Sequence, residues 1–374
     1  MAHIERQLYS RIKNQLYKGK TILIFGARRV GKTNLLKRII QEEQGVYFNG
    51  ENLQTRVQLE TTSMQKLKEL IGSSKLIGFD EVQSIPNIGL TLKLIHDTFP
   101  EVQCIATGSS AFELRNATAE SMTGRTRTYY LYPLSFGELK DHYGYPESEA
   151  QIESMLRYGL YPEVHQHVNE NERIEELMNI AANYLYKDIL MHGQVKRPEL
   201  ILDILKLLAF QIGKEVSLNE ISNKTDTNIH TVRRYLDLLE KCYVIKSLGS
   251  LSRNLRNEIG KSRKYYFIDL GIRNAVINNF NQLHQRNDIG SLWENFCVME
   301  RIKRNEYNRN FVNSYFWRTY QQQEIDYIEE YGGSLYAYEF KWSASLTKPP
   351  KSFIENYPGS EFSLISKDNF TSFV

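Results

Sequence analysis

The stretch that decides the fold is Gly26-Ala27-Arg28-Arg29-Val30-Gly31-Lys32-Thr33. It fits the pattern Gly-x-x-x-x-Gly-Lys-Ser/Thr at every position, follows the apolar run Ile22–Phe25, and opens a helical pattern over Lys32–Gln44. The glycines let backbone N–H groups curl around phosphate oxygens, and the start of the helix adds partial positive charge. We expect Lys32 to reach the β- and γ-phosphates and the Thr33 hydroxyl to ligate Mg²⁺. The sequence therefore predicts a site for ATP and Mg²⁺ lined by residues 26–34, with Asn34 as its last member.

A second motif, Leu76-Ile77-Gly78-Phe79-Asp80-Glu81, is an apolar strand that ends in two carboxylates. At the carboxyl edge of a sheet, Asp80 can hold the Mg²⁺ shell and Glu81 can polarise the attacking water. One more strand and helix, at Gly45–Phe48 and Met64–Ile71, fit between the two motifs. Alone, such an ending is usually a solvated strand terminus. Its pairing with the upstream loop favours a catalytic role.

Two further positions could contact the γ-phosphate. The run Cys104-Ile105-Ala106-Thr107-Gly108-Ser109-Ser110 ends in hydroxyl residues, and Ser109 is the favoured sensor of the phosphate or water. A plain Gly-Ser turn is the alternative. In Met122–Arg127, Arg125 is favoured over Arg127 and Arg115 to complete the transition-state charge clamp, in its own site or a neighbour's. An ordinary surface arginine is the alternative there.

Apolar runs alternate with helical segments from residue 1 to about 145. The expected strands are Thr21–Phe25, Gly45–Phe48, Lys75–Phe79, Gln103–Ala106 and Thr128–Leu131. This alternation predicts an α/β layer fold. Residues from 146 to about 250 look helical until Tyr243, after which strands return.

Composition bounds the remaining possibilities. The 374 residues are 41% hydrophobic and 24% charged, enough for two or three domains with large cores. The net charge of +3 is too small to establish a polyanionic partner. The three cysteines, Cys104, Cys242 and Cys297, lack paired spacing and indicate buried thiols in a reducing cytosol. Neither a signal peptide nor a membrane span is expected, so the expected location is the cytoplasm.

Together these motifs resemble bacterial and archaeal AAA-type ATPases whose C-terminal half is a domain of unknown function. The resemblance runs through residues 26–33, Phe-Asp-Glu-Val-Gln 79–83, Thr-Gly-Ser-Ser 107–110, Gly-Arg 124–125, Tyr-Pro-Leu-Ser-Phe-Gly-Glu-Leu 132–139, Gly-Leu-Tyr-Pro-Glu-Val 159–164, Tyr-Phe-Ile-Asp-Leu-Gly 266–271, Trp-Glu-Asn-Phe 293–296 and Trp-Arg-Thr 317–319. It implies a P-loop ATPase core with a parallel sheet (1–145), a helical connector (146–198), a winged-helix module (199–270) and a restriction-endonuclease-like α/β domain (271–374).

The residues from 200 to 268 support a winged helix independently. Leu200–Ile212 is helical, Ser217 and Glu220 form a capping box, and a third helix turns Ile229, Val232, Leu236 and Leu239 inward. Its outward residues, Asn228, Thr231, Arg233 and Arg234, suit bases and phosphates. Tyr243–Leu248 and Lys264–Ile268 can form a wing, and the basic residues near it are Arg253, Arg256, Lys261, Arg263 and Lys264, against Glu258. DNA contact is the favoured interpretation. Packing between domains is the alternative.

The C-terminal region contains a hairpin with a distinctive charge pattern. Glu339 and Lys341 share one face of its second strand, and Asp326 lies on the first. The arrangement Asp…Glu-x-Lys resembles the metal site of restriction-endonuclease-like folds, where carboxylates hold a divalent cation and the lysine stabilises phosphate charge. Glu294 resembles the extra carboxylate of such sites. Solvated charge on an amphipathic hairpin is the simpler alternative, and related folds also serve as binding platforms.

The sequence thus predicts an ATPase that couples its nucleotide state to a nucleic-acid-binding C-terminal half, with metal-dependent nuclease chemistry as one option. The alternative is an ATP-gated binding or regulatory protein whose inactive nuclease-like domain binds a protein partner. A metabolic kinase is disfavoured, because Asp80-Glu81 suits water activation better than transfer to a small molecule. Homo-oligomerisation is left open.

Overall fold

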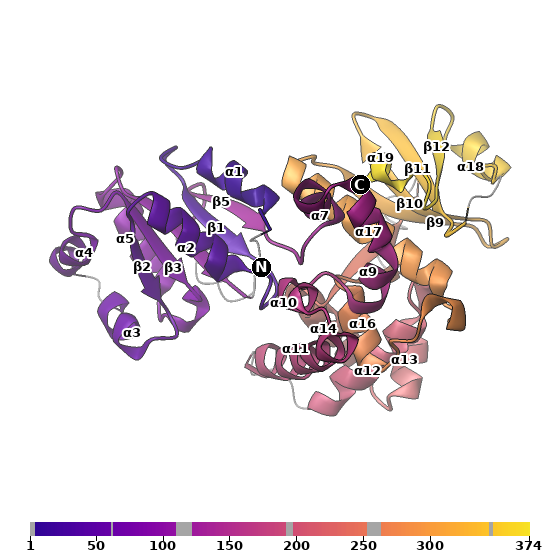
Figure 1. Cartoon of the computed structure of the whole chain (residues 1–374), viewed down its shortest axis with the longest axis horizontal. Helices are drawn as coiled ribbons and strands as arrows, with labels where there is room; N and C mark the ends of the chain where they lie inside the picture. The colour runs from indigo at the N-terminus through magenta and orange to yellow at the C-terminus, as the bar shows by residue number, and fades with distance from the viewer. Residues whose placement is uncertain (1–3, 61–62, 110–121, 192–196, 253–262, 344–346) are drawn as a thin grey trace. The chain divides into compact units, whose positions relative to one another are not determined.

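The structure is a computed structural model that describes residues 4–60, 63–109, 122–191, 197–252, 263–343 and 347–374. The chain forms two compact units (Figure 1). The first contains residues 1–134 and 241–243, and the second contains residues 135–240 and 244–374. Within the described ranges, no helix has the length and apolar character needed to cross a membrane.

The first unit is built on a five-stranded parallel sheet of order β2-β3-β4-β1-β5. Its strands are β1 Thr21–Phe25, β2 Val46–Asn49, β3 Leu76–Asp80, β4 Gln103–Gly108 and β5 Thr126–Tyr130. Strands β1, β3 and β4 are buried along their whole length, which explains their continuous apolar sequence. Because all five run the same way, the residues that follow them gather at one edge of the sheet.

Helices connect these strands. They are α1 Gln7–Lys13, α2 Lys32–Glu42, α3 Leu53–Leu59, α4 Met64–Ile71 and α5 Ile88–Thr98, with a short 3₁₀ turn η1 at Val82–Ser84. Helix α2 buries Leu35, Leu36, Ile39 and Ile40. It packs so closely on β3 that a Cβ added at Gly78 would lie 2.1 Å from Ile40. The expected strands and the helices α2 and α4 are confirmed, with ends shifted by one or two residues. Helices α1, α3 and α5 were not anticipated.

The second unit is mostly helical at its start. Its helices are α7 Phe136–Tyr143, α8 Tyr145–Ala150, α9 Ile152–Tyr158, α10 Pro162–Gln166, α11 Glu170–Met191, α12 Pro198–Phe210, α13 Leu218–Lys224, α14 Ile229–Lys241, α16 Leu270–Val276, α17 Ile289–Asn308, α18 Lys351–Asn356 and α19 Phe370–Phe373, with a 3₁₀ turn η2 at Leu283–Gln285. Side-chain hydrogen bonds cap the first turns of several of these helices. Ser135 and Glu138 form a reciprocal capping box for α7, and Ser217 accepts a bond from the Glu220 N–H to cap α13.

The strands of this unit form one seven-stranded sheet of order β12-β11-β10-β9-β7-β8-β6. They are β6 Glu215–Val216, β7 Ile245–Ser250, β8 Arg263–Phe267, β9 Asn313–Arg318, β10 Glu324–Tyr331, β11 Ser334–Phe340 and β12 Glu361–Ile365. Strand β7 pairs antiparallel with β8 and parallel with β9, where Gly249 lies opposite Tyr315. The strands expected in a wing and those expected in a terminal domain are therefore hydrogen-bonded into the same sheet.

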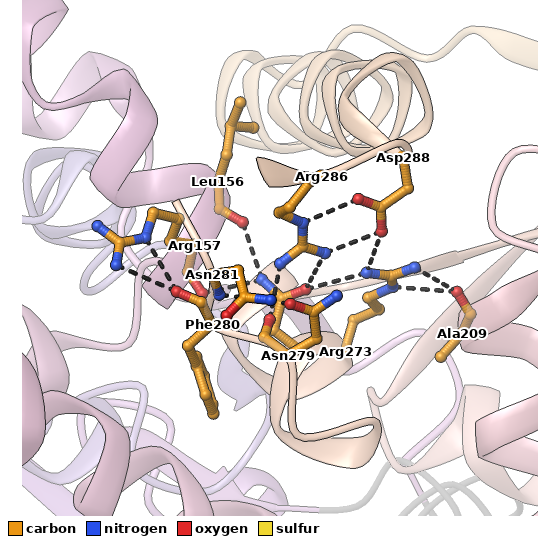
Figure 2. Close-up of polar contacts among 10 residues, drawn as sticks. Leu156, Arg157, Ala209, Arg273, Asn279, Phe280, Asn281, Arg286 and Asp288 are labelled. Atoms are coloured by element: carbon orange, nitrogen blue, oxygen red, sulfur yellow. Dashed lines mark hydrogen bonds and ion pairs between the residues drawn. The ribbon is translucent and has the colours of Figure 1, made fainter. Parts of the chain in front are cut away.

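A buried polar cluster connects the helices of the second unit (Figure 2). Asp288 binds two guanidinium groups, with 2.7 Å to Arg273 and 2.8 Å to Arg286. Arg273 also donates to the Ala209 carbonyl at the end of α12, and Arg286 donates to the Asn279 carbonyl. One carboxylate thus holds α12, α16 and the start of α17 together. No sequence motif had indicated this cluster.

Candidate functional site

The Gly26–Thr33 loop joins β1 to α2 at the carboxyl edge of the first sheet. Gly31 has a φ of 98°, which favours glycine, and a Cβ at Gly26 would lie 2.0 Å from the Leu131 carbonyl. Lys32 is buried and donates to the carbonyls of Gly26 at 2.9 Å and Ala27 at 2.7 Å. These bonds hold the Lys32 ammonium inside the loop. The close approach at Gly26 and the positive φ at Gly31 are the reasons why the loop needs glycine at both motif positions.

Arg6 fixes the loop from outside the motif. This buried arginine, just before α1, donates to the Val30 carbonyl at 2.5 Å and to the Tyr132 carbonyl at 2.6 Å. It ties the loop to the segment after β5. Nothing near Arg6 in the sequence had signalled this role, because its partners lie 24 and 126 residues away.

Asp80 ends β3 in a buried position between two hydroxyl donors. Tyr47 on β2 donates to its Oδ2 at 2.8 Å, and Thr107 on β4 donates to its Oδ1. Burial and the Asp80 carboxylate raise the pKa of Tyr47, so its hydroxyl keeps its proton. The Asp80 carboxylate is thus oriented from both neighbouring strands. Neither Tyr47 nor Thr107 was singled out from the sequence, although Thr107 stands within a quoted motif.

Glu81 follows with a φ of 48°, an uncommon conformation for a residue with a side chain. The Gln83 amide donates to the Glu81 carboxylate and, at 3.1 Å, to the Ser109 hydroxyl. Gln83 thereby connects the residue predicted to polarise the water, Glu81, with the residue predicted to sense the γ-phosphate, Ser109. The role of Gln83 itself was missed. Ser110 lies outside the described residues.

Arg125 does not join this site. It precedes β5, and Thr126 pairs with Thr21 at the start of β1, so Arg125 lies at the amino edge of the sheet, opposite the loop. Its guanidinium binds Asp97 with 2.8 Å between Nε and Oδ1. A role for Arg125 within its own site is therefore wrong, because the parallel strand direction places it at the far edge. Arg127, one residue into β5, lies near the same edge. Arg115 is outside the described residues.

The predicted nucleic-acid surface is only partly described. Asn228, just before α14, and Arg233 and Arg234 on it are exposed, and Thr231 is half-buried. The helix buries Val232, Tyr235, Leu236 and Leu239. Ile229 is 38% exposed, so its inward placement was wrong, whereas Tyr235, which was not predicted to face inward, is buried. Arg253, Arg256, Glu258 and Lys261 lie outside the described residues, whereas Arg263 is exposed and donates to Ser247.

The prediction that Lys264 contributes to a basic wing surface is wrong, because its side chain is 0% exposed. It lies among acidic side chains that include two of the predicted metal ligands. The ammonium is 2.5 Å from Glu324, 3.0 Å from Glu294 and 3.6 Å from Asp326. Tyr266 donates to Glu294 at 2.7 Å as well. Lys264 and Glu324 were both missed as members of this cluster.

The other predicted residues complete the cluster. Asp326 lies at a β-bulge in β10 and accepts a bond from the Phe340 N–H at 3.0 Å. Glu339 on β11 accepts from Lys341 at 2.7 Å. Burial, then the Asp326 charge, raises the pKa of Glu294 to about 8 and also raises that of Glu339. Where the structure describes side chains, no three His, Cys, Asp or Glu residues are grouped to hold a metal ion.

Three family models match successive parts of the chain. Residues 18–140 match an AAA domain, residues 149–283 match a domain of unknown function (DUF8612), and residues 289–368 match a second one (DUF4143). The first match covers the Gly26–Thr33 loop, Asp80 and Glu81. This part of the chain is thus similar to AAA-type ATPases, in agreement with its parallel sheet and loop.

Individual relatives extend the similarity along the chain. An uncharacterized protein of Mycobacterium tuberculosis is 26% identical over 339 residues, which is 90% of this chain and 73% of the relative. An uncharacterized protein of Methanocaldococcus jannaschii is 25% identical over 342 residues, 85% of this chain and 74% of the relative. A solved structure, Aeropyrum pernix ORC1 in complex with DNA, is 14% identical and covers 74% of this chain and 93% of its own, with a TM-score of 0.32. A score this low supports no inference about function.

Proposed function

We propose that this chain is an ATP-binding AAA-type ATPase that hydrolyses ATP with Mg²⁺. The observation that carries the proposal is the position of the phosphate loop and the Asp80-Glu81 pair at one edge of a parallel sheet. The loop follows β1 and the carboxylates end β3, with β4 between them. Ligands of open parallel sheets bind at this edge.

Each side chain has a defined task in this proposal. Loop N–H groups and the Lys32 ammonium bind the phosphates. Thr33 and Asp80 would hold Mg²⁺, and the Asp80 carboxylate fits because the hydroxyls of Tyr47 and Thr107 fix its orientation. Bound Mg²⁺ would neutralise phosphate charge. Glu81 orients and polarises the attacking water, and Gln83 keeps Glu81 beside Ser109.

Separate measurements of ATP binding and ATP turnover test this assignment. Glu81→Gln keeps the size of the side chain but removes its capacity to accept a proton. We expect ATP to bind this variant with ordinary affinity while turnover falls by about 10²-fold or more. A Gln83→Ala protein should lose less turnover, because it retains the Glu81 carboxylate. Full turnover in Glu81→Gln would remove Glu81 from the reaction.

The proposed coupling is to a nucleic-acid-binding surface in the second unit, formed by a winged helix. The exposed Arg233 and Arg234 of α14 support it, as do the three helices α12, α13 and α14 followed by the β7–β8 hairpin. DNA affinity should fall steeply with salt, and Arg233→Ala with Arg234→Ala should flatten the slope. A flat slope in the unmodified protein would favour a protein partner.

A second candidate function is an ATP-gated binding protein whose nuclease-like domain is inactive. The observation that favours it is the Lys264 ammonium within the predicted metal site. Metal-dependent cleavage through Asp326, Glu339, Lys341 and Glu294 is the competing assignment. Incubation with DNA and RNA in Mg²⁺ or Mn²⁺ separates the two. Cleavage that is lost in Asp326→Ala would support the nuclease.

A further inference from the structure

Lys264 lies where the carboxylates of the second unit converge. Its ammonium is within 3.6 Å of Glu294, Glu324 and Asp326, and its side chain is 0% exposed. The lysine comes from β8, and the carboxylates come from α17 and β10. A buried ammonium is tolerated only when it is paired and hydrogen-bonded. The fold meets that requirement with acidic side chains from two separate elements.

Several of the oxygen atoms that a metal would need already accept a hydrogen bond or face the Lys264 ammonium. Asp326 accepts from the Phe340 N–H through Oδ2 and faces Lys264 through Oδ1. One oxygen of Glu294 accepts from both Lys264 and Tyr266. Glu339 accepts from Lys341. Mg²⁺ demands a near-octahedral shell of oxygens and keeps several waters. These side chains do not fit such an ion while Lys264 stays in place.

The backbone also closes against Glu294. A Cβ added at Gly213, whose φ is +73°, would lie 2.7 Å from Oε2 of Glu294. Lys264 and Tyr266 thus donate to one oxygen of the carboxylate, and the backbone of Gly213 passes close to the other. A divalent ion at the oxygen bound by Lys264 would have to displace the ammonium and the Tyr266 hydroxyl.

We propose that Lys264 is the resident cation of this cluster, in the place where a nuclease of this residue pattern would bind a divalent metal. The lysine fixes the positions of β8, β10 and α17, and the C-terminal half acts by binding rather than by phosphodiester cleavage. This inference is independent of the ATP site, which lies in the other compact unit. An experiment can therefore contradict this inference without contradicting the proposed ATPase, and the reverse.

The test uses the full-length protein and Mn²⁺ alone, with bound Mn²⁺ measured by electron paramagnetic resonance. Lys264→Met removes the charge at similar length. We expect it to gain about one Mn²⁺ per chain, because uncompensated carboxylates are hard oxygen ligands. The double variant with Lys264→Met and Asp326→Asn should no longer bind the gained ion. Lys246→Met is the matched control, since Lys246 is a 46% exposed lysine on the neighbouring strand β7, and it should gain nothing.

The unmodified protein and Asp326→Asn should bind Mn²⁺ identically, and this comparison decides the matter if Lys264→Met fails to fold. Mn²⁺ bound by the unmodified protein and lost in Asp326→Asn would overturn the proposal. A folded Lys264→Met protein that gains no ion would overturn it too. ATP turnover, measured in parallel, should be unchanged in Lys264→Met.

Discussion

The phenolic hydroxyl of Tyr47 on β2 donates a 2.8 Å hydrogen bond to Oδ2 of Asp80 on β3. The other carboxylate oxygen accepts from Thr107 on β4. The strand that ends in Asp80 is thus flanked on both sides by strands that each supply a hydroxyl donor. Outer partners of this kind hold a ligating carboxylate in one orientation. The sheet order therefore contributes directly to the proposed Mg²⁺ site.

Removal of the Tyr47 hydroxyl should impair the ATPase without disturbing the fold. In Tyr47→Phe, Asp80 loses the bond to its Oδ2 and keeps the one from Thr107, and we expect roughly a 10-fold to 100-fold loss of activity or Mg²⁺ affinity. Turnover measured against Mg²⁺ concentration would reveal it. Tyr145→Phe, which removes a hydroxyl bonded to Glu149 on an exposed helix, is the control. Equal Mg²⁺ dependence in both variants would show that Tyr47 does not support the site.

The link from Arg6 to the loop predicts a binding defect from a residue outside the motif. Arg6→Gln should leave the buried Val30 carbonyl without its guanidinium partner, at a cost of about 1–3 kcal/mol. Part of this cost should appear as weaker binding of a fluorescent ATP analogue. The control is Arg38→Gln, because Arg38 makes exposed ion pairs with Glu5 and Glu42 that contribute little. ATP affinity equal to that of the unmodified protein would place the role of Arg6 elsewhere.

The cluster around Asp288 should be critical for the stability of the second unit. Asp288→Ala leaves Arg273 and Arg286 buried without their shared counter-charge, and we expect a loss of about 3–5 kcal/mol. Chemical denaturation followed by far-UV circular dichroism would measure it. Glu199→Ala, which breaks an ion pair with the exposed Arg197, should cost about 1 kcal/mol or less. Similar losses in both variants would contradict the importance of burial.

His165 should make stability depend on pH. Burial, followed by the nearby Arg173 and His142 charges, lowers its pKa from 6.5 to about 4. Between these values the unfolded chain binds a proton that the folded chain does not, so stability falls as the pH drops from 6.5 toward 4. The contribution lost at pH 5 should be about 2 kcal/mol, because pH 5 lies about 1.5 units below the unfolded pKa.

Thermal unfolding at pH 7 and pH 5 would test this titration. His165→Gln cannot take up the proton and should lose less stability than the unmodified protein over this interval. The control is His284→Gln, which removes a different histidine of the same unit. Identical pH dependence in the unmodified and His165→Gln proteins would exclude His165 as the source.

The features predicted correctly from the sequence are those encoded locally. The loop between β1 and α2, the strand that ends in Asp80 and the five strands of the first sheet all follow from short motifs and apolar runs. The partners of these residues are non-local, which is why Arg6 and Tyr47 were missed. Arg125 was misplaced because its position depends on the direction of β5 within the sheet.

The second unit shows the same division between local and distant signals. The helices around Ser217 and the Asp326–Glu339 hairpin were anticipated, since caps and turns are local. The inward face of α14 was slightly misjudged, because Ile229 at the first turn fits the helical period but lies at the surface. The basic neighbours of Lys264 in the sequence predict a surface cation. Only the three-dimensional sheet brings it to Glu324 and Asp326.

The most direct test of the central claim is ATP turnover by the full-length protein in Mg²⁺, compared with Lys32→Ala and with Lys66→Ala, which removes an exposed lysine of the same unit. If the Gly26–Thr33 loop binds the triphosphate, Lys32→Ala should lose turnover by at least about 10²-fold while Lys66→Ala retains it. Full turnover by Lys32→Ala, or none by the unmodified protein in any condition with Mg²⁺ and ATP, would contradict the assignment.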